Sequence, residues 1–130
     1  MNAADQVKRE LRDGLTSAMK ERRVDAVTAL RSALAAIDNA EAISTDSLGD
    51  PGAARKPLGE SFGANEVPRR ALDAGELAEI LRAECDGRLR AAEHYDLHGR
   101  GAEAERVKRE AAALAGYVEI AEGRAQQADS

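Results

Sequence analysis

Residues 4–42 read ADQVKRELRDGLTSAMKERRVDAVTALRSALAAIDNAEA and contain two helical patterns with almost nothing between them. The first pattern covers residues 4–22 and the second covers residues 25–42. The stripe positions, three or four residues apart, are Val7, Leu11, Leu15, Ala18 and Arg22, then Val27, Leu30, Leu34, Ile37 and Glu41. This spacing places the side chains on one face of each helix. Because the link is so short, we expect the two helices to pack as an antiparallel hairpin.

A second hairpin is predicted in the other half of the chain, over residues 73–98 and 102–122. Asp73 can cap the first of these helices, and Glu76, three residues later, completes a capping box. The sequence HGRG ends that helix and leads into the next one. Residues 123–130 are expected to fray. The predicted fold is all-α, with four helices arranged as two antiparallel hairpins.

Residues 44–71 separate the two hairpins and interrupt the helical pattern. All three prolines of the chain, Pro51, Pro57 and Pro68, fall in this stretch. Proline removes a backbone donor and opposes helix formation, so we expect a long, flexible loop here. Residues 1–122 would then form one helical domain.

The composition limits the classes of function. The net charge is −5, whereas domains that bind duplex nucleic acid usually carry an excess of basic residues. A single cysteine, Cys85, excludes an internal disulfide and suits a reducing compartment. No apolar run approaches the roughly 20 residues needed to span a bilayer, and the N-terminus lacks the apolar core of a signal peptide. We therefore expect a cytoplasmic protein that does not enter the membrane.

Two charged residues fall inside the apolar stripe of the third predicted helix. Glu84 and Arg88 are four residues apart on that face, so they can pair along the helix. Arg31 flanks the inward face of the second helix and can reach Glu84 with its guanidinium group. We predict a cluster of Arg31, Glu84 and Arg88 at the junction of the hairpins, with a structural role in packing and register. A site for an anion or for a partner's carboxylate is the alternative.

The sequence offers little for catalysis or metal binding. His94 and His98 are four residues apart, a spacing that can chelate a metal, but Cys85 falls on the opposite side of the same helix and supplies no third ligand. None of the phosphate-binding or nucleophile motifs is present. We therefore predict no catalytic residue, no metal and no cofactor.

The most basic segment is KERR, with Lys20, Arg22 and Arg23 at the end of the first helix. Positive charge at a helix C-terminus complements the helix dipole, which is a sufficient structural reason for it. A contact with tRNA phosphate or with a partner protein is the alternative. Arg69 and Arg70 form a second, weaker basic pair.

Two stretches together resemble the GatB/YqeY family. Residues 11–43 are similar to its opening, with Ala18-Met19-Lys20, Thr28-Ala29-Leu30-Arg31 and Asn39-Ala40-Glu41 at the family's characteristic places; the extra alanine departs slightly from the pattern. Residues 77–118 resemble its second hairpin, with the Ala-Ala-Glu-x-Tyr run from Ala91 to Tyr95 and a turn at Gly99-Arg100. The resemblance covers about three quarters of the chain in the family's order.

This resemblance implies a link to the tRNA-dependent amidotransferase system and to carbon–nitrogen ligases that use glutamine as amido donor. In GatB the catalytic centre lies in a different domain, and the region similar to this chain helps to hold tRNA. The family continues with a further helical subdomain, which has no counterpart after Tyr117 and Val118. The resemblance therefore implies an accessory or adaptor protein without catalysis of its own.

Three hypotheses follow. The first is a helical adaptor that docks a protein partner. The second is a tRNA-positioning factor in amidation, with Lys20, Arg22 and Arg23 near phosphate. The third is a structural homo-oligomer that pairs exposed apolar surface.

Overall fold

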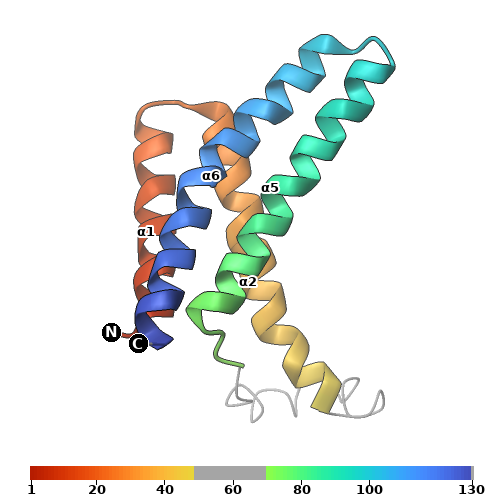
Figure 1. Cartoon of the computed structure of the whole chain (residues 1–130). Helices are drawn as coiled ribbons and strands as arrows, with labels where there is room; N and C mark the ends of the chain where they lie inside the picture. The colour runs from red at the N-terminus through yellow and green to blue at the C-terminus, as the bar shows by residue number, and fades with distance from the viewer. Residues whose placement is uncertain (49–69, 130) are drawn as a thin grey trace, which may run out of the picture.

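The computed structural model describes residues 1–48 and 70–129 and consists there of four helices (Figure 1). They are α1 (Ala3–Lys20), α2 (Val24–Leu48), α5 (Ala74–Leu97) and α6 (Gly101–Asp129). All four pack against one another, and α5 and α6 share the most extensive contact. This confirms the predicted all-α fold with four helices.

Local sequence signals fix where α1 and α5 begin. The Asn2 side chain caps α1 by accepting a hydrogen bond from the Asp5 amide at 2.8 Å. At α5 the predicted capping box is present, because the Asp73 carboxylate accepts from the Glu76 amide at 2.8 Å and the Glu76 carboxylate accepts from the Asp73 amide at 3.0 Å. Both the Asn2 cap and the capping box satisfy amide donors that a helix leaves unpaired at its start.

The turn between α1 and α2 differs from the prediction, since α1 ends at Lys20 and not at residue 22. Arg22 adopts a left-handed backbone conformation with φ of 58°. The Arg23 amide then donates to the Ala18 carbonyl at 2.9 Å, and the Arg22 amide donates to the Met19 carbonyl at 3.2 Å. This is the Schellman pattern, which pairs the last carbonyls of a helix and reverses the chain.

Two helices, α2 and α6, continue further along the chain than predicted. The second helix was expected to stop at residue 42 and to be followed by a loop over residues 44–71, but α2 continues to Leu48; residues 49–69 lie outside the described residues. The tail 123–130 was expected to fray, but α6 continues to Asp129. Arg124 explains this, because its guanidinium contacts Gln6 and forms an ion pair with Glu10 at 3.1 Å, both on α1.

The main core lies where all four helices meet, a region that we call the base. Its fully buried large side chains come from all four helices: Val7, Leu11, Ile37, Leu77, Leu81 and Leu114. Most of these positions belong to the apolar stripes in the sequence. Glu41, also a stripe position, is buried and paired with Lys8 at 2.7 Å, which joins α2 to α1.

Beyond the base, the α5–α6 hairpin projects past the α1–α2 turn, as its blue and cyan tip shows in Figure 1. We call residues 91–107 the arm. It has a separate small core of Ala92, Ala104 and Val107, with Ala91 and Tyr95 packed against it. The arm therefore buries only short side chains.

Gly14 leaves room for the Tyr117 ring of α6 to pack against α1. A Cβ atom at this position would overlap the Tyr117 hydroxyl and lie 2.9 Å from the ring carbon Cζ. Gly14 therefore has a packing role between α1 and α6.

Among the described residues, no helix combines the length and the apolar character needed to cross a membrane.

Candidate functional site

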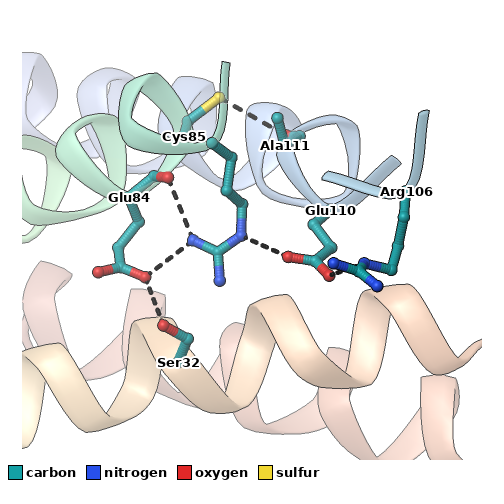
Figure 2. Close-up of polar contacts among 7 residues, drawn as sticks. Ser32, Glu84, Cys85, Arg106, Glu110 and Ala111 are labelled. Atoms are coloured by element: carbon teal, nitrogen blue, oxygen red, sulfur yellow. Dashed lines mark hydrogen bonds and ion pairs between the residues drawn. The ribbon is translucent and has the colours of Figure 1, made fainter. Parts of the chain in front are cut away.

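A polar cluster joins α2, α5 and α6 at the junction of the two hairpins (Figure 2). The Arg88 guanidinium is its centre: Nη1 donates to the Glu84 carboxylate at 3.0 Å, and Nε donates to the Glu110 carboxylate at 3.0 Å. The Ser32 hydroxyl donates to the same Glu84 oxygen at 2.7 Å. Arg106 approaches Glu110 at 3.9 Å from the outside. These contacts tie three helices together.

The predicted cluster is confirmed for Glu84 and Arg88 and wrong for Arg31. The Arg31 side chain is exposed and contacts the Met19 sulfur at 4.0 Å instead. Arg31 and Ser32 are adjacent, so they point about 100° apart around the helix. Ser32 faces α5, and Arg31 faces the end of α1.

Burial makes this cluster important for stability. The side chains of Arg88 and Glu110 are only 15% and 10% exposed, and Glu84 is 24% exposed. Charges with so little water need their partners, because an unpaired buried charge costs several kcal/mol, on the order of 3–5. Sequence reasoning missed Glu110, although it lies at the edge of the α6 apolar face. The arrangement therefore helps to fix how the two hairpins are aligned against each other.

Cys85 lies beside this cluster but on the other surface of α5. Its thiol donates to the Ala111 carbonyl at 3.5 Å. Burial, and then the neighbouring Asp86 carboxylate, raise the pKa of the Cys85 thiol. A protonated thiol is a poor nucleophile and a poor metal ligand.

His94 and His98 are both exposed near the arm tip, with ring centroids 4.3 Å apart. The Nδ1 atom of His98 lies 2.8 Å from the His94 carbonyl oxygen. In the part of the chain that the structure describes, no group of three or more histidine, cysteine or carboxylate side chains is placed to hold a metal ion.

The basic turn is exposed at Lys20, Arg22 and Arg23. Arg23 forms an ion pair with Glu21 at 2.9 Å, while the structure shows no ion pair for Lys20 or Arg22 within the described residues. Of the weaker pair, Arg70 contacts Glu76, and Arg69 lies outside the described residues.

A surface groove between α5 and α6 was not foreseen from the sequence. Its floor is apolar and comprises Cys85, Leu89, Ala111, Ala112 and Ala115. A larger neighbouring hollow of about 500 Å³ shares Leu89 and Lys108 with it. Leu89 is 46% exposed. We call this combined feature the α5–α6 groove.

No protein-family model, no curated protein and no solved structure matches this chain.

Proposed function

We propose that this chain is a helical adaptor or accessory module of the GatB/YqeY type, without catalysis of its own, that works by docking a partner protein. The observation that carries the proposal is the α5–α6 groove, where the apolar Leu89 is left 46% exposed beside an open hollow. Covering exposed apolar surface with a partner protein is favourable, because it removes that surface from water. The residues similar to the GatB/YqeY family support the link to the tRNA amidotransferase system.

The largely buried charged side chains form ion pairs that hold helices together. Arg88 is held by Glu84 and Glu110, and Lys8 is held by Glu41, so these charges link helices. The Cys85 thiol has a raised pKa. These features support a scaffold that acts by binding a partner at its surface.

Site-specific photo-crosslinking tests the proposal. A photoreactive residue is placed singly at Leu89 in the groove, at Thr28 on α2 and at Arg12 on α1, all of them exposed. In the cells that make the protein, a discrete adduct with another protein is expected from at least one position. Adducts with RNA alone, or no protein adduct from any position, would contradict the adaptor function. Adducts between two copies, with a dimer mass in sedimentation equilibrium, would favour a homo-oligomer.

A tRNA-positioning role is a second candidate, favoured by the exposed Lys20 and Arg22 at the α1–α2 turn. Fluorescence anisotropy with unfractionated tRNA at low and moderate salt tests it. The variant carries Lys20→Ala, Arg22→Gly and Arg23→Ala, and the control carries Arg9→Ala and Arg12→Ala on the outer face of α1. Steeply salt-dependent binding that is lost only in the turn variant would favour this role. Absence of binding at low salt would remove it.

A further inference from the structure

We propose that the α5–α6 groove binds a basic, amphipathic helix of a partner protein. This proposal rests on the adaptor function above and adds the surface and the chemistry of the partner. It is carried by two independent properties of the groove, namely a floor of small apolar side chains and a rim with two carboxylates that have no ion pair within the described residues.

The floor is shaped to receive a helix. Ala112 and Ala115 on α6 are both exposed and lack long side chains, so another helix can approach the α6 backbone there. Leu89 and Cys85, four residues apart on α5, form the α5 side of the floor and lie one above the other. In Figure 2, Cys85 and Ala111 lie on the side of α5 and α6 away from Ser32. The groove therefore faces outward and is not covered by α2.

The rim supplies negative charge. Asp86, Glu93 and Asp96 line the larger hollow together with Arg90 and Lys108. Lys108 is already engaged with Glu105 at 3.3 Å and with Asp96 at 3.6 Å. Its hydrogen bond to Glu105 and the charges of Glu105 and Asp96 raise the pKa of Lys108, which shows that its surroundings are acidic.

The rim carboxylates that do not pair with Lys108 indicate which charge the partner helix should carry. Asp86 and Glu93 are exposed, seven residues apart on the same face of α5, and have no ion pair within the described residues. Among the described residues of this rim, Lys108 is paired with Asp96 and Glu105, so Arg90 remains beside the two carboxylates of Asp86 and Glu93. An acidic rim beside an apolar floor complements a helix with lysines or arginines flanking an apolar stripe.

The length of the groove sets the length of the partner segment. From Cys85 to Asp96 the α5 axis rises by about 16 Å, or about three helical turns. A partner helix of about 11–14 residues covers this distance. Apolar residues at i and i+4 of that helix would meet Leu89 and the alanine floor.

Fluorescence anisotropy with the full chain tests the groove directly. The probe is a labelled, helix-stapled peptide of about 14 residues, with leucines at helical spacing on one face and lysines flanking them. Binding is expected to weaken by about tenfold or more when Leu89→Ser is introduced, and similarly for Asp86→Lys combined with Glu93→Lys. A peptide with glutamates in place of the lysines is expected to bind at least about tenfold more weakly.

Matched controls distinguish binding in the groove from nonspecific binding elsewhere on the protein. Met19→Ser removes a side chain of similar exposure, 49%, on α1. Asp5→Lys with Asp13→Lys changes the net charge by the same amount on a different face. Both controls should leave binding unchanged, with circular dichroism confirming that every variant is folded.

Alkylation of Cys85 gives a second readout, because its thiol forms part of the floor. The lysine peptide should slow alkylation by iodoacetamide, and the glutamate peptide should not. Equal binding of both peptides, equal binding to the Leu89→Ser variant, or no protection of Cys85 would overturn the groove proposal. A partner crosslinked only from Thr28 or Arg12 would overturn it while leaving the adaptor function in place.

Discussion

The base and the arm of this molecule share α5 and α6 but are held together differently. In the base, leucine and isoleucine side chains from four helices are fully buried, including Leu11, Ile37 and Leu81. In the arm, two helices share a core of Ala92, Ala104 and Val107. An alanine buries far less apolar area than a leucine, so the hydrophobic stabilisation per turn falls toward the tip.

The arm compensates with contacts on its surface. Arg100 forms an ion pair with Glu103 at 2.8 Å, and its guanidinium lies 5.5 Å from the centre of the Tyr95 ring. Exposed pairs of this kind contribute about 0–1 kcal/mol each. We therefore expect the base to set the global stability and the arm to open locally, in advance of global unfolding.

The largest expected effect comes from Leu81→Ala in the base. Leu81 is fully buried, so the substitution should lower the free energy of unfolding by about 3 kcal/mol. Urea denaturation measures this. Val107→Ala in the arm is the matched comparison, and it should mainly accelerate amide hydrogen exchange near the tip. If both substitutions lowered the global stability equally, the division into base and arm would be wrong.

Arg88→Met tests the boundary between the two regions. It leaves the Glu84 and Glu110 carboxylates facing each other without their shared cation. The expected loss is about 2–3 kcal/mol, at or below the range for breaking a buried pair because the cluster keeps some water contact. A triple variant that also carries Glu84→Gln and Glu110→Gln should recover part of this. If Arg88→Met left the free energy of unfolding unchanged, the ion pairs of the cluster would contribute nothing to stability.

Gly14→Ala examines helix packing within the base. The added Cβ forces Tyr117 away from α1, which should cost more than the roughly 1 kcal/mol of helix propensity that alanine gains. We expect a net loss of about 1 kcal/mol by thermal unfolding. In a Tyr117→Ala background the same substitution should become stabilising. A substitution that stabilises the protein in both backgrounds would disprove the close approach.

Arg22→Gly should have a smaller effect in the opposite direction. Arginine at φ of 58° is strained, and glycine adopts this conformation without a Cβ penalty. The expected gain is about 0.5–1 kcal/mol, with an unchanged denaturant slope. A loss of stability would mean that the arginine side chain holds the turn.

The smallest effect concerns the pH dependence of the arm. The hydrogen bond from Arg100 lowers the pKa of Glu103 from the ordinary value of 4.5. A lowered pKa in the folded state gives stability that is present above the ordinary value and is lost as the pH falls through the folded value. The protection factors of the amides at the tip, which correct the exchange rates for their intrinsic pH dependence, should therefore fall in acid. Arg100→Ala should remove this additional pH dependence.

Much of the fold could be predicted because it depends on local signals. The capping box at Asp73 and the stripe through Val7 and Leu11 are encoded within a few residues, and the structure shows both. The ends of α2 and α6 could not be predicted in the same way. The Arg124 contacts that hold the tail span more than a hundred residues of sequence, and helical spacing contains no information about them.

The candidate site, too, could be predicted only where it depends on local sequence. Glu84 and Arg88 lie on one helix, so their pairing follows from spacing. The choice of Ser32 over Arg31, and the participation of Glu110, depend on which side of α2 faces α5 and how α6 is rotated. The α5–α6 groove arises from two helices at once, and neither helix alone indicates it.

The contacts of Arg124 with Gln6 and Glu10 have a consequence for the molecule as a whole. They bring the last turns of α6 against the first turns of α1, so both chain ends lie at one pole, while the arm tip points to the other (Figure 1). A domain, label or surface attached through either terminus would therefore be carried on the same side. The arm tip would remain directed away from that attachment.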